Sequence, residues 1–310
     1  MTNKELKERQ SWSLFKKIDH SLGVIDQFLS RTGAYVSFSG GKDSTVLLDL
    51  CRVIKPDIKA VFCNTGNEYP NIARFVRELQ KTEGYNIEII RPELNIPSII
   101  SQFGFPLVSK ETSNKLWYIR NKPETKVAQV GLGEAGDSRF AVPIKYRYLI
   151  NERYGCSHKC CEYLKKKPFR KYEKETGLMP ILGTMAGESR LRTVQYIKQG
   201  GCNSFRSDGK RYTHSMPLSI WTAEDIWAYI KQRNLKICDL YEHGFERTGC
   251  MFCGFGMQFA NDIRLRKLYE MYPKWYEKCM AYTNNGVTFR EALRKLLAIN
   301  GLELPDEKNK

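Results

Sequence analysis

A short apolar strand that leads directly into a glycine-rich turn and a helix constrains the fold of this chain most. Residues 34–38 are mainly apolar and aromatic, residues 39–44 read Ser-Gly-Gly-Lys-Asp-Ser, and a helical pattern continues from Thr45 to Ile54. Two further strands are predicted at 58–63 and 87–90, separated by a helix over 70–82. Strands that alternate with helices pair in parallel beneath helices on both faces, so we expect an α/β fold.

The remaining chain predicts additions to this sheet. A long segment over about residues 105–177 is rich in Lys, Arg, Tyr and Trp and lacks a clear period, so we interpret it as helices and loops. A buried strand over 179–184 is expected to rejoin the sheet. The expected organisation is an N-terminal helical segment (1–30), a main domain (31–256) that contains the insertion, and a helical region that ends in a polar tail (257–310).

Charge and composition narrow the class of protein. Fifty Lys and Arg residues against thirty-four Asp and Glu residues give a formal net charge of +16. This balance favours nucleic acid or a phosphorylated small molecule as a partner, and a solvated basic surface is the alternative. No apolar stretch approaches the roughly 18 residues of a membrane-spanning helix, and residues 1–10 do not resemble a secretory signal. We therefore expect a cytoplasmic protein with no membrane partner.

The turn at residues 39–44 has the chemistry of an anion-binding loop. Glycines let the backbone approach a ligand, and the amides and dipole of the following helix favour negative charge. Lys42 adds a cation, while Ser39 and Ser44 add hydroxyl donors. The spacing differs from the Walker pattern, which places four residues between Gly and Gly-Lys, so it predicts another kind of nucleotide loop. An ordinary Gly-Gly turn beside a helix cap is the alternative.

Residues 39–44 resemble the PP-loop of the adenine-nucleotide alpha-hydrolase family. The resemblance implies a Rossmann-like parallel sheet with helices on both faces, and ATP bound with Mg²⁺ and attacked at its α-phosphate. It implies that the loop residues hold the nucleotide: Ser39, Gly40, Gly41, Lys42, Asp43 and Ser44. Lys42 and Asp43 are also expected to act in catalysis. The family's second strand commonly ends in Asp-Thr-Gly, and here Asn64, Thr65 and Gly66 stand in its place, without the carboxylate, and are expected to contact the nucleotide.

Four of the ten cysteines have the spacing of metal ligands. Cys160 and Cys161 are adjacent, and Cys250 and Cys253 form a second pair far along the chain. Four thiolates can hold zinc or an iron–sulfur cluster. Adjacent cysteines strain the usual spacing of a zinc site, whereas the irons of a cluster can each take one sulfur, so the pattern favours a cluster. Zinc and unliganded buried thiols are the alternatives.

The double cysteine, residues 217–227 and residues 241–253 together resemble the phosphoadenosine phosphosulfate (PAPS) reductase family, over about residues 31–256. Members with this cysteine set, the adenylylsulfate reductases and the DNA phosphorothioation sulfurtransferases, carry a 4Fe-4S cluster. The resemblance implies a cluster on the four cysteines of the two pairs, with Cys156 as a substitute ligand.

The same resemblance implies anion contacts in the segment that follows the strand at 179–184. Gly183, Glu188 and Ser189 are expected to contact the nucleotide, and Arg190 and Arg192 to take part in catalysis. Met185 stands where the family often has Arg. Arg190 and Arg192 as ordinary helix-surface charges are the alternative.

Basic and aromatic residues alternate around the double cysteine. The basic ones are Lys159, Lys165, Lys166, Lys167, Arg170 and Lys171, with Tyr163 and Phe169 among them. Such a segment suits a strand of nucleic acid, because cations take phosphates and rings stack on bases. It could equally offset the negative charge of a thiolate-bound cluster.

Three functions follow from the resemblance. The first is an ATP-dependent, AMP-forming sulfurtransferase that adenylates a substrate, expected to be nucleic acid, and receives sulfur or electrons from a partner protein. The second is a sulfonucleotide reductase, whose nucleophilic cysteine lies in a Cys-Gly-Leu-His segment near the C-terminus. This chain has no cysteine after Cys279, so Cys202 or Cys279 would have to substitute. Cys202, between Gly201 and Asn203 in a predicted loop, is a candidate free nucleophile, with an idle surface thiol as the alternative. The third is a non-catalytic, redox-sensing module that binds nucleotide and nucleic acid.

Overall fold

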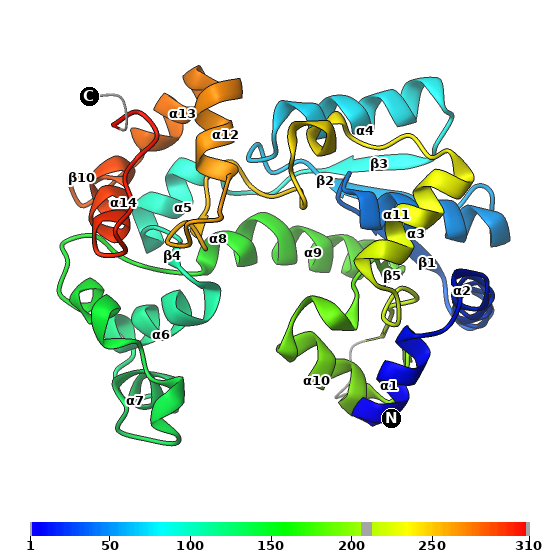
Figure 1. Ribbon diagram of the computed structural model, residues 1–310, viewed down its shortest axis with the longest axis horizontal. Coiled ribbons are helices and arrows are strands. Elements are labelled where there is room, and N and C mark those ends of the chain that lie inside the picture. The colour runs from blue at the N-terminus through cyan, green and yellow to red at the C-terminus, as the bar shows by residue number, and fades with distance from the viewer. Residues whose placement is uncertain (1, 206–212, 308–310) are drawn as a thin grey trace. The chain divides into compact units, whose positions relative to one another are not determined.

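A computed structural model describes residues 2–205 and 213–307 (Figure 1). The chain divides into two compact units, each assembled from segments that are distant in the sequence. Unit 1 consists of Met1–Asn64, Pro70–Ile90 and Phe169–Thr248, and unit 2 consists of Thr65–Tyr69, Arg91–Pro168 and Gly249–Lys310. The expected organisation into 1–30, 31–256 and 257–310 stays a prediction.

The described part of unit 1 is built on a six-stranded sheet with the order β3-β2-β1-β5-β7-β6. The strands are β1 (Ala34–Phe38), β2 (Ala60–Cys63), β3 (Ile87–Ile90), β5 (Met179–Leu182), β6 (Asn203–Ser204) and β7 (His214–Ser215). All neighbouring strands are parallel except the edge pair β6 and β7. The chain leaves β1 toward β2 on one side and returns to its other side at β5, so the strand order reverses there. Open α/β sheets bind ligands at such a point.

Helices cover both faces of this sheet, as a Rossmann-like α/β fold requires. The helices of unit 1 are α1 (Asn3–Gln10), α2 (Leu14–Leu29), α3 (Lys42–Ile54), α4 (Pro70–Thr82), α9 (Lys167–Thr176, in unit 1 from Phe169 on), α10 (Arg190–Gln199) and α11 (Ala223–Arg233), with short turns η4 (Ala186–Glu188) and η5 (Asp239–His243). Phe169 and Tyr172 of α9 pack on Tyr35 of β1. Helix α3 contacts β1 and packs on α2 and α11. The expected fold class is therefore confirmed.

The predicted elements of unit 1 agree closely with the observed ones. The helix over 70–82 and the strand over 87–90 have the expected bounds. The helix expected over 1–30 is two helices, α1 and α2. A new helix starts at Leu14 because the Ser13 side chain caps it by accepting a hydrogen bond from the Lys16 amide. Helix α3 begins at Lys42 instead of Thr45, so the second half of the Ser39–Ser44 loop is its first turn.

Unit 2 is mainly helical. Its helices are α5 (Ile96–Phe103), α6 (Lys110–Asn121), α7 (Lys126–Leu132), α8 (Lys159–Cys161), α12 (Arg264–Met271), α13 (Pro273–Met280) and α14 (Phe289–Ala298), with η1 (Ser138–Phe140), η2 (Ile144–Ile150) and the π-helical turn η3 (Glu162–Lys166). Two short strand pairs join it: parallel β4 (Leu107–Val108) with β8 (Gly254–Phe255), and antiparallel β9 (Thr283–Asn284) with β10 (Val287–Thr288). Phe105, Phe252 and Phe289 form an aromatic core, with ring centroids 4.4 Å apart for Phe252 and Phe289.

Residues 301–307, which the sequence presents as a polar tail, are held against α13 and α14. Leu304 is fully buried, Asp306 accepts a hydrogen bond from the Tyr276 hydroxyl at 2.6 Å, and Glu307 accepts one from Arg294 at 2.7 Å. The buried Leu304 side chain and the two hydrogen-bonded carboxylates that follow it therefore hold this segment in place. Within the described ranges, no helix combines the length and the apolar character needed to cross a membrane.

Candidate functional site

The loop between β1 and α3 is preorganised by its own serines. The Ser44 hydroxyl donates to the Gly41 carbonyl at 2.9 Å and accepts from the Ser39 amide at 3.2 Å. Gly40 has a φ of +72°, which favours glycine because other residues rarely adopt it. Gly41, the N-cap residue of α3, has no side chain that could cap the helix. The Lys42 amide is engaged by the Tyr241 hydroxyl, so only the later amides of the first turn could meet an anion.

Two side chains from the segment after α11 close on this loop. A Cβ atom on Gly41 would lie 2.7 Å from Thr248 Oγ1 and 3.3 Å from the Tyr241 hydroxyl, so only glycine fits there. The Lys42 amide donates to the Tyr241 hydroxyl at 2.8 Å. Burial raises the pKa of Tyr241 to about 12, so the phenol stays protonated. The sequence assigned neither Tyr241 nor Thr248 a role.

The two predicted catalytic residues of the loop form an ion pair. Lys42 is 5% exposed, and its Nζ lies 2.7 Å from Asp43 Oδ1. The buried ammonium group is therefore neutralised by its neighbour. An anionic ligand would offer Lys42 a second partner at the same place.

The segment after β5 brings further predicted residues to the loop. Glu188 accepts a hydrogen bond from the Met185 amide at 3.0 Å, pairs with Arg192, and lies 3.7 Å from Arg247. Burial, and then the charge of Arg247, lower the pKa of Arg192, while the Asp43 carboxylate acts in the opposite direction. Glu188 thus holds Arg192 within the electrostatic field of the loop.

Gly183, Ser189 and Arg190 have different surroundings. A Cβ atom on Gly183 would lie 3.2 Å from the Asp43 carbonyl, so glycine permits the close approach of β5 to α3. The Ser189 hydroxyl accepts from the Arg192 amide at 3.3 Å and caps α10. Arg190 is exposed and makes no hydrogen bond or ion pair with any residue that the structure describes. Ser189 therefore has a structural task, and Arg190 is available to a ligand.

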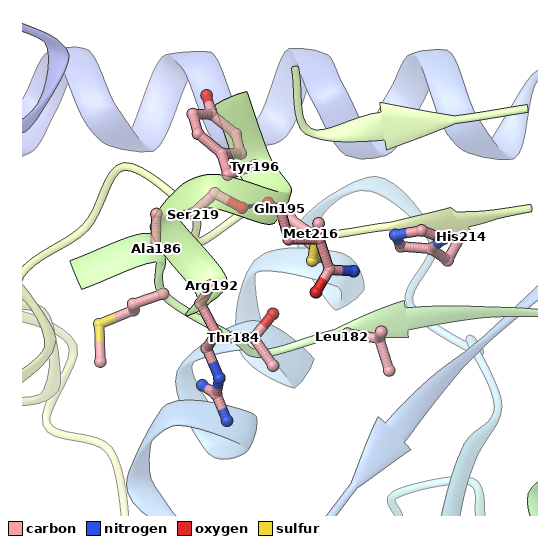
Figure 2. Close-up of a pocket in the computed structure, with 10 residues that line it drawn as sticks. Leu182, Thr184, Ala186, Arg192, Gln195, Tyr196, His214, Met216 and Ser219 are labelled. Carbon is pink, nitrogen blue, oxygen red and sulfur yellow. Dashed lines mark hydrogen bonds between the residues drawn. The ribbon is translucent and has the colours of Figure 1, made fainter. Parts of the chain in front are cut away.

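A pocket of about 180 Å³ opens beside Arg192 at the carboxyl end of β5 (Figure 2). Leu182, Thr184, Gln195 and Met216 are among the residues that line it. The Thr184 hydroxyl is buried and has no hydrogen-bond partner among the described residues. A buried hydroxyl without a partner is costly, so it marks a position where a ligand atom could bind. Sequence reasoning missed Thr184, since only its surroundings distinguish it from other threonines.

The Asn64-Thr65-Gly66 motif is divided between the two units. In unit 1, the Asn64 amide donates to the Ile90 carbonyl at 2.9 Å. In unit 2, the Thr65 hydroxyl donates to Glu68 Oε1 at 2.6 Å, and Gly66 adopts a φ of +72° in the turn between them. The Thr65 hydroxyl therefore has the nearby Glu68 carboxylate as its partner in place of a nucleotide.

Asn67 ties this turn to the second cysteine pair within unit 2. Its side-chain amide donates to the Phe252 carbonyl at 3.1 Å, and its Oδ1 accepts from the Phe252 amide at 2.8 Å. The Met251 amide donates to the Asn67 carbonyl at 2.8 Å. The loop that carries Cys250 and Cys253 is therefore fixed by three hydrogen bonds to one asparagine, which the sequence did not single out.

The four cysteines of the two predicted pairs all belong to unit 2 and influence one another. A hydrogen bond between Cys160 and Cys161 raises the pKa of Cys160 and lowers that of Cys161. The charges of Cys250 and Cys253 also raise the pKa of Cys160. Among the described side chains, no three His, Cys, Asp or Glu groups converge closely enough to hold one metal ion.

Two cations accompany these cysteines. The charge of Cys250 is the largest of the effects that raise the pKa of Lys165, and Glu68 adds to it. Arg264 donates to Asp262 at 2.9 Å and to the Phe255 carbonyl, and it has a hydrogen bond with Cys253. Burial raises the pKa of Cys253 to about 11, and the Arg264 charge opposes this rise. Arg264 lies beyond the segment that the sequence associated with the site.

The other two cysteines of interest are buried. Cys156, the expected substitute ligand, places its Sγ 3.2 Å from the Ser113 hydroxyl. Cys202, expected as an exposed loop thiol or a nucleophile, is 5% exposed and lies 3.8 Å from the Tyr196 hydroxyl. Burial raises the pKa of Cys202 to about 11, so it is a protonated thiol at neutral pH. The expectation of an exposed thiol is wrong, because the flanking β6 draws this loop into the sheet.

The basic segment is shared between the units. Lys159 and Lys167 of unit 2 lie over the rings of Trp117 and Tyr163, at 4.5 and 3.7 Å from the ring centroids. Arg170 and Lys171 belong to unit 1. The alternation of cations and rings in the sequence therefore produces local cation–π contacts in unit 2.

Comparisons with known proteins identify the family of the chain. The model of the phosphoadenosine phosphosulfate reductase domain matches residues 33–127 and 139–254. An uncharacterized protein of Methanocaldococcus jannaschii is 24% identical over 272 residues, which cover 87% of this chain and 52% of that one. The chain thus spans about half the length of this relative, and 40% of a second protein of the same organism, which is 25% identical over 247 residues.

Two named proteins are also similar. The adenosine 5'-phosphosulfate reductase of Geobacillus kaustophilus is 25% identical over 229 residues, which cover 73% of this chain and 74% of that one. A crystal structure of phosphoadenylyl-sulfate (PAPS) reductase from Candida auris aligns with a TM-score of 0.45 and 13% identity, covering 81% of this chain and 96% of that one.

Proposed function

Because the chain belongs to the phosphoadenosine phosphosulfate reductase family, we propose that unit 1 binds ATP and Mg²⁺ on the Ser39–Ser44 loop and adenylates a nucleic-acid substrate for sulfur transfer. One observation carries the proposal: the first turn of α3, which begins at a glycine, contains the buried Lys42–Asp43 pair. Backbone amides, a helix dipole and a cation suit a polyphosphate.

The proposed reaction has two steps. A substrate oxygen attacks the α-phosphorus of ATP, the bond from that phosphorus to the bridging oxygen breaks, and pyrophosphate leaves. Sulfide-level sulfur from a donor protein then attacks the substrate atom that bears the adenylated oxygen, the bond between that atom and the oxygen breaks, and AMP leaves with the oxygen. In the first step, Lys42, Arg192 and the amides of α3 offset the charge that develops on pyrophosphate. Asp43 offers a carboxylate for Mg²⁺ once phosphate replaces it as the partner of Lys42.

The second part of the proposal is a 4Fe-4S cluster on Cys160, Cys161, Cys250 and Cys253. All four cysteines belong to unit 2. Cys160 and Cys161 are adjacent in the sequence, which suits a cluster, whose ligands bind different irons, better than a zinc ion, whose ligands share one centre. Lys165 and Arg264 would offset the negative charge of the bound thiolates. A cluster would supply one-electron chemistry or a place for sulfur.

Sulfonucleotide reduction is the alternative, favoured by the similarity to the reductase of Geobacillus kaustophilus. That reaction needs a thiolate that attacks sulfur. Cys279 is buried in α13, and burial raises its pKa to about 12, while Cys202 is buried in unit 1. Neither thiol is reactive in this arrangement, so adenylation ranks first. A redox-sensing binding module is the third possibility.

Equilibrium binding to anaerobically prepared protein separates these functions. Mg-ATP, adenylylsulfate and its 3′-phosphorylated form are compared, and pyrophosphate release from ATP is followed with and without nucleic acid. We expect preference for ATP and release that depends on nucleic acid. Tight binding of a sulfonucleotide with sulfite formed on reduction would favour the reductase, and ATP binding without any turnover would favour the binding module.

A matched pair of variants links the activity to the loop. Lys42→Met removes the cation of the loop, and Lys55→Met removes an exposed lysine at the other end of the same helix. We expect the first change to abolish pyrophosphate release and the second to leave it unaltered. Full activity in Lys42→Met would contradict the assignment of this loop.

A further inference from the structure

Unit 2 contains a second pocket, of about 170 Å³, where the C-terminal ends of α5 and α6 meet the Gly155–Cys156 segment and the turn after β9. Its wall is built by a buried polar side chain. Asn284, which is 5% exposed, donates to the Ile100 carbonyl at 2.8 Å and accepts from the Gly155 amide at 2.7 Å. The pocket therefore has a fixed frame whose own hydrogen bonds are satisfied.

Two aromatic rings line this pocket and are held by neighbours. Phe103 stacks on Tyr163 with ring centroids 5.0 Å apart and an interplanar angle of 27°. Trp117 lies beneath the Lys159 ammonium, which is 4.5 Å from its ring centroid. Both rings are only half-buried, so each offers surface to a planar ligand. Aromatic faces of this kind stack on nucleobases of any sequence.

The polar groups of the pocket offer both donors and acceptors. The Asn121 amide nitrogen donates to the Trp117 carbonyl at 2.8 Å, which leaves its oxygen as an acceptor. One nitrogen of the Arg120 guanidinium donates to the Tyr154 carbonyl, and the group has further N–H donors. Gln102 is exposed and forms no hydrogen bond with the described residues. A nucleobase edge presents the complementary mixture, whereas a phosphate would accept only.

We propose that this pocket binds one unpaired nucleobase of the nucleic-acid substrate. The base stacks on Trp117 or Phe103, and its edge meets Gln102, Arg120 and Asn121. The inference rests on the proposed nucleic-acid substrate and adds what the protein recognises in it: an unstacked base, and therefore a single strand or a loop. Lys159 at Trp117 would take the adjoining phosphate.

The site adjoins the cysteines through the chain itself. Gly155 and Cys156 line the pocket, and the same segment continues to Cys160 and Cys161. A base bound here would be held by the unit that carries all four proposed cluster ligands. The pocket is thus placed to anchor the substrate of a sulfur transfer.

The test measures binding of a labelled short single-stranded oligonucleotide to the whole protein by fluorescence anisotropy, with the duplex of the same sequence as comparison. Trp117→Leu should weaken binding of the single strand by about 10-fold, within the range that loss of one stacked base produces. Trp117→Phe, which keeps a ring, should stay within about 2-fold of wild type. Trp275→Leu is the matched control, because Trp275 is a part-exposed ring of unit 2 that also lies under a lysine, 4.8 Å from Lys278.

A second variant guards against misfolding of Trp117→Leu. Gln102 and Asn121 are exposed, so Gln102→Ala with Asn121→Ala should fold normally and weaken single-strand binding by at least about 3-fold. The slope of affinity against salt should not change, because neither residue meets a phosphate. Equal affinity for the duplex, an unchanged affinity in both pocket variants, or an equal loss in Trp275→Leu would overturn the proposal.

The outcome can be separated from that of the proposed function. A wild-type protein that binds the strand through Trp117 but releases no pyrophosphate from ATP would support the base pocket and contradict adenylation. If a strand stimulates pyrophosphate release but Trp117→Leu does not alter the binding of that strand, adenylation would be supported and the base pocket contradicted. Failure of any strand to bind would contradict both.

Discussion

Replacing Asp43 by alanine should destabilise unit 1 more than replacing Lys42, its partner in the ion pair. The two side chains differ in exposure, at 6% for Lys42 and 25% for Asp43. Removing Asp43 leaves a buried ammonium group without its charged hydrogen bond, which costs about 2 kcal/mol. In Lys42→Met the carboxylate can turn to water and the apolar stem still packs, so the cost is about 0.5 kcal/mol.

Thermal unfolding followed by circular dichroism measures this difference. For a unit of this size, about 2 kcal/mol lowers the midpoint by roughly 4–8 °C, so Asp43→Ala should melt that far below wild type and Lys42→Met close to it. Saturating Mg-ATP, at a hundred times its Kd, should add about 2.7 kcal/mol to the wild type and to the Lys55→Met control. Asp43→Ala and Lys42→Met should each lose most of the stabilisation by Mg-ATP, since each variant lacks one contact to the ligand.

The reasoning would be refuted by the opposite order of stability. If Lys42→Met unfolds at a much lower temperature than Asp43→Ala, the ammonium group is not the buried member of the pair. If Asp43→Ala keeps the stability of wild type, Lys42 is hydrated or finds another acceptor. If Mg-ATP stabilises Lys42→Met as much as it stabilises wild type, the loop is not part of the ATP site.

Three other predictions follow from single side chains. Cys160→Ala should lose the brown colour and the acid-labile sulfide that we expect of the anaerobically purified wild type, and a colourless wild type with stoichiometric zinc would contradict the cluster. Thr184→Val should raise the urea midpoint by an amount equivalent to about 1 kcal/mol, because it removes a buried hydroxyl without a partner among the described residues, and a lower midpoint would show that the hydroxyl is satisfied. Burial raises the pKa of Asp306, but the hydrogen bonds from Tyr276 and Arg290 outweigh this and lower it overall. The stability that this carboxylate contributes is therefore present above its unfolded pKa of about 3.9 and is lost as the pH falls through its lower folded pKa. The difference in unfolding midpoint between wild type and Asp306→Asn should be constant from about pH 8 to 5 and shrink below about pH 4, and a difference that persists in stronger acid would contradict the ion pair.

The sequence located the turn between β1 and α3 because its determinants are local. Gly40 needs a positive φ, Ser39 and Ser44 bond within six residues, and the helical pattern begins at once. The same locality explains why the bounds at 70–82 and 87–90 are correct. The two cysteine pairs were visible as candidate ligands, since residue type and spacing together are characteristic of metal ligands, and their role as ligands stays a prediction.

Other parts of the site had no such local pattern. Tyr241 and Thr248 meet the loop from a segment far along the chain, and Asn67 reaches the backbone of Phe252 across a similar separation. Cys202 looked like a loop thiol because glycine precedes it, yet its burial depends on β6 and on Tyr196. A one-dimensional pattern carries no information on which distant side chain fills a given space.

The sequence by itself thus determined the central strands and helices of the sheet, the glycine-rich turn and the set of candidate metal ligands, because turn preferences, helix periodicity and ligand chemistry act over a few residues. Only the tertiary structure decided which charges are buried, which thiols are protonated and which hydroxyl is left without a partner. Those properties depend on desolvation and on contacts between segments that the chain brings together only when it folds.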